Sequence, residues 1–364
     1  MAVYQLLQTF AHGDAIGNET LSIKKILLNK GFKTGIYGLY CTPQLEKEFL
    51  NYRKLDNLEK DDLLIYHFAI GCRELCEFIK KINCKKIMLY HNITPSNFFE
   101  EYSKLFVEIT NAGRQELLML KDEFDYCWAD SEYNKKELLD IGYRGPIDIL
   151  PLIINFNDYD KALDITTLEK YANNDYVNIL FVGRIAPNKK HEDVIRVFYY
   201  YKKYINSKAR LIFVGNYDGM EKYYLRLLDY IKKLNLKDVI FTGHIPFNSI
   251  LSYYNLADIF LCMSEHEGFC VPLIEAMYFD IPIIAYKSTA IPYVLGDAGI
   301  IVENKEPMHI ANIIDRIIKS KELKNELISK QRKRLNKFTY EQTSEIFLNY
   351  LTKVMKVNNS EKRK

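Results

Sequence analysis

Short apolar runs alternate with longer amphipathic stretches along most of the chain. Runs that are apolar throughout predict strands buried on both faces of a parallel sheet, and the stretches between them predict helices. In the first half, strands are expected at residues 3–10, 34–39, 63–68, 86–91 and 126–131. In the second half, they are expected at residues 177–183, 210–215, 239–243, 259–263 and 281–286. The alternation predicts two doubly wound α/β domains.

A polar stretch without a strand pattern, at about residues 155–176, separates the two halves and is interpreted as a linker. We therefore expect a first domain at 1–155 and a second at 156–338, followed by a C-terminal segment at 339–364. Within that segment, residues 340–354 are expected to form a helix. Helices are also expected at about residues 21–29 and 98–121.

Composition narrows the class of protein. The chain has 50 basic and 47 acidic residues among 364, which gives no case for nucleic-acid binding. Its seven cysteines are scattered without a zinc pattern and are interpreted as reduced thiols of a cytoplasmic protein. No run of about 18 apolar residues is present. We expect a soluble protein, and peripheral contact with the inner face of a membrane remains open.

Residues 264–277 follow an apolar run at 258–263 that predicts a buried strand, and they combine a glycine loop with a helix start. Gly268 breaks the apolar run, and Pro272 suits the first turn of a helix. The unpaired N–H groups of such a turn can bind an anion or sugar hydroxyls. Glu267 and Glu275 lie on either side of this corner, and each carboxylate can accept two hydroxyl hydrogen bonds from a diol. The alternative is that the two acids only favour the helix start.

Other polar residues follow predicted strands. Gly13 and Gly17 lie in the loop after the first strand, where backbone amides could approach phosphate, although two glycines can also make a simple turn. His67 and His91 end two strands, and together they indicate a shared pocket, whereas one alone would more often be structural.

Strand ends in the second half carry charge. Arg184 follows Gly183 directly, and Lys189 lies in the same loop, where both could bind phosphate oxygens. Surface charge is the alternative, and it fits Lys190 better than Arg184. After residues 239–243, the backbone of His244 and Ile245 could form hydrogen bonds with the edge of a nucleotide base.

These motifs resemble those of the retaining, nucleotide-sugar-dependent glycosyltransferases of GT-B fold, family four. The resemblance covers nearly the whole chain and is carried by residues 13–18, 90–95, 182–189, 242–244 and 264–277. It implies two Rossmann-like domains facing across a cleft, with the last helix crossing back to the first domain. Bacterial members that build capsule, lipopolysaccharide O-chains or other surface glycans are the most similar. Cys270 departs from the family, because many members have glycine there.

The resemblance also implies roles. Donor binding falls to Gly17, Gly183, Arg184, Lys189, His244, Ile245, Glu267, Gly268, Phe269, Cys270, Val271 and Glu275, with Glu275 on the ribose diol. The acceptor side comprises Asp14, His67, His91, Asn92 and Arg114. The catalytic group comprises His91, Glu267, Arg184 and Lys189, with the two cations neutralising the departing nucleoside diphosphate.

The expected reaction moves a hexosyl unit from GDP-mannose or a UDP-hexose to a glycan or lipid-linked oligosaccharide. No Asp-x-Asp pair stands at a strand end, so we expect no cofactor and a metal-independent reaction with no metal site. The alternatives are a nucleotide-sugar epimerase and a non-catalytic nucleotide-sugar-binding subunit. A GT-B phosphorylase would need a lysine for pyridoxal phosphate and is usually longer.

Overall fold

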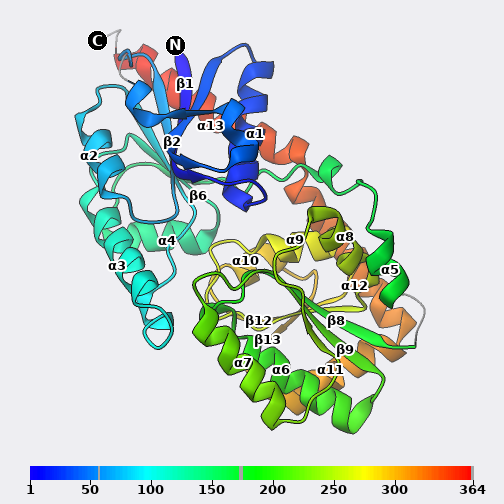
Figure 1. The fold of residues 1–364 in the computed structure, drawn as a ribbon. Helices are drawn as coiled ribbons and strands as arrows, with labels where there is room; N and C mark the ends of the chain where they lie inside the picture. The colour runs from blue at the N-terminus through cyan, green and yellow to red at the C-terminus, as the bar shows by residue number, and fades with distance from the viewer. Residues whose placement is uncertain (56–57, 172–174, 362–364) are drawn as a thin grey trace. The chain divides into compact units, whose positions relative to one another are not determined.

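The computed structural model describes residues 1–55, 58–171 and 175–361 (Figure 1). Its contacts divide the chain into two compact units. Unit 1 contains residues 1–96, 106–156 and 337–364, and unit 2 contains residues 97–105 and 157–336. The expected boundaries fell at 155/156 and 338/339, and residues 97–105 were expected in the first domain.

Unit 1 is built on a seven-stranded parallel sheet of order β3-β2-β1-β4-β5-β6-β7. Its strands are β1 (Ala2–Phe10), β2 (Lys33–Cys41), β3 (Phe49–Asn51), β4 (Leu63–Phe68), β5 (Lys85–Tyr90), β6 (Tyr126–Ala129) and β7 (Ile147–Ile149). Its helices are α1 (Ala15–Asn29), α2 (Arg73–Lys81), α3 (Lys104–Met119), α4 (Glu132–Ile141) and α13 (Tyr340–Glu361). Helices α1 and α13 cover one face of the sheet, and α2, α3 and α4 cover the other (Figure 1).

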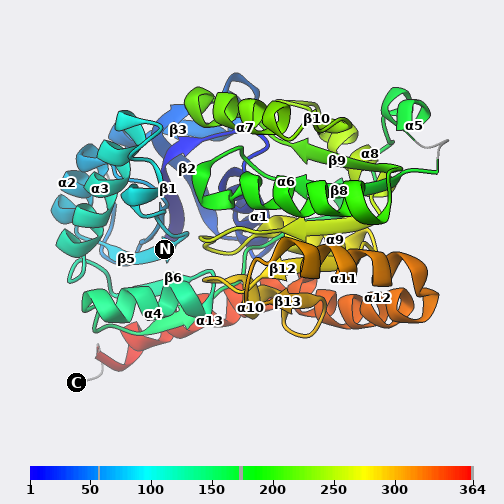
Figure 2. The same cartoon turned by 90° about the horizontal axis from the view of Figure 1, so that it is seen from below.

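Unit 2 is built on a six-stranded parallel sheet of order β10-β9-β8-β11-β12-β13. Its strands are β8 (Val177–Val182), β9 (Ala209–Val214), β10 (Val239–Phe241), β11 (Ile259–Cys262), β12 (Ile283–Tyr286) and β13 (Ile300–Val302). Its helices are α5 (Ile165–Tyr171), α6 (His191–Tyr200), α7 (Glu221–Lys233), α8 (Phe247–Leu256), α9 (Val271–Tyr278), α10 (Ile291–Leu295), α11 (Pro307–Lys319) and α12 (Lys321–Leu335). Helix α6 packs beside α11 (Figure 2), and α9 packs beside α12.

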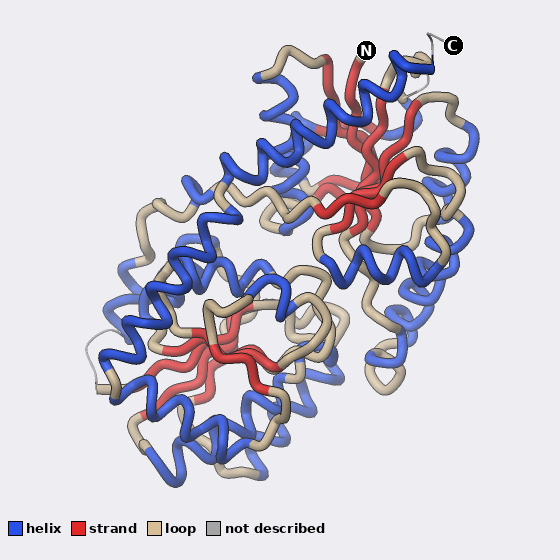
Figure 3. Tube along the Cα trace, turned by 180° about the vertical axis from the view of Figure 1, so that it is seen from behind, coloured by secondary structure: helices blue, strands red, loops and turns tan. Residues whose placement is uncertain are grey.

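Each unit has its strands in the middle and its helices on both sides (Figure 3). The central strands β4, β8 and β9 are buried along their whole length because both of their faces meet helices, whereas the edge strands β3 and β10 are half-buried. Two Rossmann-like α/β domains were predicted from the apolar runs, and this fold class is confirmed. Among the described residues, none of the helices has the length and apolar character needed to cross a bilayer.

Several element boundaries differ from expectation. Helix α1 begins at Ala15 rather than near residue 21, so Gly17 lies inside its first turn. A Cβ at Gly17 would run into the carbonyl oxygen of Ala11, so glycine permits this close approach of helix and loop. Helix α3 begins at Lys104 rather than near residue 98.

Candidate functional site

The loop between β11 and α9 holds the acidic corner of unit 2. Glu267 is 6% exposed, and its backbone N–H donates to Thr289 Oγ1 at 2.8 Å. Phe269 and Cys270 are buried, and Gly268 is half-buried. Helix α9 begins at Val271, with Pro272 in its first turn as the sequence predicts. The first-turn N–H groups of α9 therefore lie next to the Glu267 loop in the chain.

Cys270 is the N-cap of α9 and has a left-handed backbone, with φ of 76° and ψ of 64°. Residues with a Cβ rarely adopt this conformation, which glycine adopts freely. The left-handed backbone at this position explains why glycine was expected there from the resemblance to family four. Cys270 adopts this conformation despite its Cβ.

Lys189 forms an ion pair with Glu267. Its Nζ lies 2.5 Å from Glu267 Oε2, and the Lys189 side chain is 21% exposed. Burial disfavours the ammonium, but Glu267 and nearby thiols together raise the pKa of Lys189 above its usual value. Asn188 ties the same turn to the loop, because its Nδ2 donates to the His266 carbonyl at 3.0 Å. The loop thus holds a buried, charged pair of fixed geometry.

Glu275, one turn into α9, has a tyrosine hydroxyl on each carboxylate oxygen. Tyr159 donates to Oε1 at 2.7 Å, and Tyr254, on α8, donates to Oε2 at 2.5 Å. Burial raises the pKa of Glu275, and the two tyrosine hydrogen bonds oppose that rise. Both oxygens keep a second lone pair for a further donor. Sequence reasoning missed both tyrosines, because their pairing with Glu275 depends on tertiary contacts.

Strand ends β8 and β9 approach each other closely. A Cβ at Gly215 would collide with the carbonyl oxygen of Gly183, and both glycines have φ near 150°. Arg184, next in the chain, is exposed, and its Nη2 donates to the Asp218 carbonyl at 2.6 Å. Burial lowers its pKa, although nearby acids oppose the shift. His244 is exposed and Ile245 is half-buried in the loop after β10.

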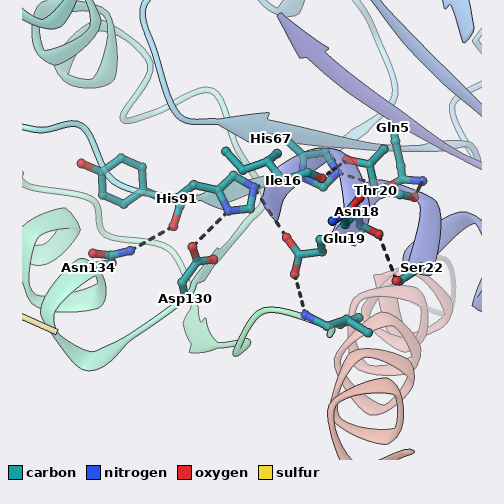
Figure 4. Close-up of polar contacts among 12 residues, drawn as sticks. Gln5, Ile16, Asn18, Glu19, Thr20, Ser22, His67, His91, Asp130 and Asn134 are labelled. Atoms are coloured by element: carbon teal, nitrogen blue, oxygen red, sulfur yellow. Dashed lines mark hydrogen bonds and ion pairs between the residues drawn. The ribbon is translucent and has the colours of Figure 1, made fainter. Parts of the chain in front are cut away.

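The predicted histidines of unit 1 meet in a buried polar chain (Figure 4). His67 Nδ1 lies 3.0 Å from His91 Nε2, as expected for histidines at neighbouring strand ends. His67 Nε2 contacts Gln5 Oε1, and His91 Nδ1 contacts Asp130 Oδ2, each at 3.0 Å. Both ring nitrogens of His91 thus have partners inside unit 1.

Two carboxylates complete this chain, and sequence reasoning gave a role to neither. Glu19, on α1, has its Oε2 3.8 Å from His91 Nε2, while its Oε1 accepts from the Ile153 N–H at 3.2 Å. Burial raises the pKa of Glu19 to about 8, and it also raises the pKa of Asp130. Asp130 could have been found from the sequence, because it directly follows a strand, and His67 and His91 were found from similar positions at strand ends.

The remaining predicted acceptor-side residues hold the loop after β5. Asn92 Nδ2 donates to Asn134 Oδ1 and to Glu137 Oε2, at 3.0 and 2.8 Å. Arg114 Nη2 donates to the Ile93 carbonyl and to Glu137 Oε1, at 2.7 and 2.8 Å. Asp14 is exposed and is the N-cap of α1. Asn92 and Arg114 therefore position the segment that carries His91.

Of the predicted donor residues, the structure brings Lys189 and Glu267 into contact and places Glu275 in the helix that follows. Arg184 contacts the loop after β9, a different part of unit 2. In chemical terms, unit 2 offers two oriented carboxylates, a half-buried ammonium and a helix N-terminus, which suit a ligand with both hydroxyls and phosphates.

The two Rossmann-like units give the chain a fold of GT-B type. Residues 167–334 match the family model described as "Glycosyl transferases group 1". The matched segment lies within unit 2 and covers less than half of the chain.

Several of the curated relatives have names from bacterial polysaccharide systems. An uncharacterised 41.2 kDa protein in the cps region of Klebsiella pneumoniae is 24% identical over 74% of this chain and 73% of its own length. O-antigen chain mannosyltransferase B of Escherichia coli is 26% identical over 55% of this chain and 48% of its own. The capsular polysaccharide biosynthesis glycosyltransferase CapM of Staphylococcus aureus is 31% identical over 47% and 45%. The last two matches each span about half of the relative's length.

Solved structures match the whole chain in fold. Sucrose-phosphate synthase of Thermosynechococcus elongatus superposes with a TM-score of 0.75 at 15% identity, covering 98% of this chain and 100% of that one. Anabaena Alr3699/HepE in complex with UDP-glucose superposes with a TM-score of 0.74 at 17% identity, covering 97% and 100%. At these identities the likeness establishes the fold.

Proposed function

We propose that this chain is a retaining glycosyltransferase that moves a hexosyl unit from a nucleoside diphosphate sugar to a glycan or lipid-linked oligosaccharide. The proposed pathway is the assembly of bacterial surface polysaccharide. The names of the E. coli and S. aureus relatives support this pathway, and the mannosyltransferase favours GDP-mannose. The UDP-glucose complex of HepE supports UDP-hexoses as alternative donor substrates.

The observation that carries the proposal is the Lys189–Glu267 pair beside the start of α9. Glycosyl transfer develops positive charge on the sugar and negative charge on the leaving diphosphate. Glu267, held in place by its ion pair with Lys189, would bind sugar hydroxyls. The helix N-terminus would hold the diphosphate without reorganising during the reaction.

The other roles follow from position. Glu275, oriented by its two tyrosines, would accept the ribose hydroxyls. Arg184 would add positive charge near the diphosphate, so the transfer step would need no added metal. Residues of unit 1, including Asp14, His67 and Asn92, would shape the acceptor side. The acceptor, if it is lipid-linked, would bring the enzyme to the inner face of a membrane.

The test is a panel of GDP- and UDP-sugars, offered with and without acceptor glycans. The expected result is nucleoside diphosphate release that requires an acceptor and is not increased by Mg²⁺ or Mn²⁺. Lys189→Met should lower kcat by roughly 10²–10³-fold, as loss of one transition-state donor does. Lys237→Met changes an exposed lysine of the same unit and serves as the matched control. Full turnover by Lys189→Met, or conversion of the donor to a new nucleotide sugar without acceptor, would reject the proposal.

A further inference from the structure

Three buried side chains in unit 1 point their polar atoms at one another (Figure 4). Glu19 comes from α1, His67 from the end of β4, and His91 from the residue after β5. They are 1%, 3% and 9% exposed, respectively. One ligand atom from each lies within 4.8 Å of the others.

The outer partner of His67 fixes which of its nitrogens carries hydrogen. The Gln5 side-chain N–H donates to the Thr20 carbonyl at 3.0 Å, so Gln5 Oε1 is the atom that faces His67. An amide oxygen only accepts, so His67 Nε2 must be the donor. In the neutral ring, His67 Nδ1 is then a lone pair directed at His91.

The outer partner of His91 acts in the same way. An ionised Asp130 accepts at Oδ2 from His91 Nδ1, which leaves a lone pair on Nε2. Two lone pairs then face each other across 3.0 Å, and Glu19 Oε2 lies 3.8 Å from one of them. Glu19 Oε2 is buried and accepts no hydrogen bond. In the chain without a metal, protons occupy these places, because burial raises the pKa of Glu19 to about 8 and, against the effect of burial, the neighbouring Asp130 and Glu19 raise the pKa of His91.

Protons and a metal ion compete for the three converging atoms of Glu19, His67 and His91. A divalent metal ion would satisfy all three atoms at once. Two imidazoles and a carboxylate are donors that Zn²⁺ accepts, and ligand atoms about 2.0–2.2 Å from a shared ion lie roughly 3–4 Å apart. Metal-bound histidines usually donate their other N–H to a carboxylate or another oxygen. Gln5 and Asp130 supply those oxygens.

A second group of potential ligands in unit 2 shows the contrast. Cys262, Glu267 and Cys270 also converge, but the Lys189 ammonium already contacts that carboxylate. The Lys189 side chain therefore already supplies a positive charge to the cluster of Cys262, Glu267 and Cys270. Glu19, His67 and His91 have no such lysine or arginine among their described contacts.

We propose that Glu19, His67 and His91 form a transition-metal site of the zinc type, with Gln5 and Asp130 orienting the two imidazoles. The ion would join α1 to the ends of β4 and β5 and stabilise unit 1. The site shares His67 and His91 with the expected acceptor side, but metal binding is measured without substrate, so its test and the transferase assay can fail separately.

The test is titration of the chelator-treated full chain with Co²⁺, both folded and during refolding. We expect one equivalent to bind with visible absorption typical of low-coordinate Co²⁺ and without a thiolate charge-transfer band. Zn²⁺ should displace the Co²⁺ and raise the unfolding midpoint. His67→Gln and Glu19→Gln should abolish stoichiometric binding. His12→Gln, at an exposed histidine of the same unit, should retain it.

Asp130→Asn keeps all three metal ligands. It therefore tests the site without the risk that a lost ligand side chain simply prevents folding. It should bind Co²⁺ roughly 10–100-fold more weakly than wild type while keeping the same spectrum. The proposal is overturned if wild type binds no stoichiometric Co²⁺, or if the ligand variants bind as wild type does. A thiolate band would also overturn it, because it would place the ion at cysteines rather than at Glu19, His67 and His91.

Discussion

Glu275 is the residue whose environment says most about ligand binding. Its two oxygens accept from Tyr159 and Tyr254, so the carboxylate is fixed before a ligand arrives. A hydrogen bond to a charged group contributes about 1.5–3 kcal/mol. These tyrosines therefore set both the orientation and the proton affinity of Glu275.

We predict that Tyr254→Phe raises KM for the nucleotide sugar by roughly 10-fold or more, with a smaller effect on kcat. Donor binding should weaken as pH falls through the pKa of Glu275, because the protonated carboxyl accepts fewer hydroxyl bonds. Tyr254→Phe should move that transition to higher pH, since its hydroxyl lowers the pKa of Glu275. Tyr253→Phe, at the adjacent tyrosine of α8, is the control. An unchanged KM and pH profile would exclude a positioning role for Tyr254.

His191, at the start of α6, is a second residue whose charge state matters. It is completely buried between Phe181, Phe213 and Tyr223. Burial first, and then Lys189, lowers the pKa of His191 to about 3. The folded protein therefore keeps a neutral ring over a range of pH in which an unfolded chain binds a proton.

We predict that this histidine makes the protein acid-sensitive. As pH falls below about 6.5, the unfolded state gains a proton that the folded state does not, so the free energy of unfolding decreases. At about pH 5 the loss attributable to His191 should be about 2 kcal/mol, from 1.36 kcal/mol per pH unit. Urea unfolding of wild type and His191→Phe at neutral and acidic pH measures it. Equal acid sensitivity in both proteins would contradict the prediction.

At the scale of elements, α13 completes the core of unit 1 although it comes from the far end of the chain. Phe347 is fully buried and meets Trp128 of β6 edge-on, with ring centroids 5.6 Å apart. Lys85 Nζ also donates to the Val354 carbonyl at 3.0 Å. One face of the first sheet therefore depends on this C-terminal helix.

We predict that Phe347→Ala lowers the free energy of unfolding of unit 1 by about 3–5 kcal/mol, through lost burial and the cavity it leaves. Denaturant titration followed by tryptophan fluorescence measures the loss, because Trp128 is the only tryptophan. Asn349→Ala, on the exposed side of α13, should change stability little. A similar loss from both substitutions would indicate that helix propensity, rather than packing on Trp128, is responsible.

For the whole molecule, apolar periodicity was enough to predict two parallel-sheet domains. Strands β3, β7 and β13 were not among the expected strands, because segments of three residues carry too little pattern. The meeting of His67 and His91 followed from strand order, since both end neighbouring parallel strands. The contacts of Glu275 with Tyr159, and of His91 with Glu19, could not be predicted, because they join segments whose approach is set by packing rather than by local pattern.

The two separate cores lead to a prediction about the molecule as a whole. The proposed donor site lies in unit 2, whereas Trp128 reports on unit 1. A nucleotide sugar at 100 times its Kd should stabilise the unit that binds it by about 2.7 kcal/mol. We therefore expect the donor to raise the unfolding midpoint seen by circular dichroism for unit 2 more than the midpoint seen by Trp128 fluorescence. Glu275→Ala should abolish the shift. A larger shift in Trp128 fluorescence than in the unit 2 transition would place the donor site in unit 1 and refute the assignment of Glu267 and Glu275.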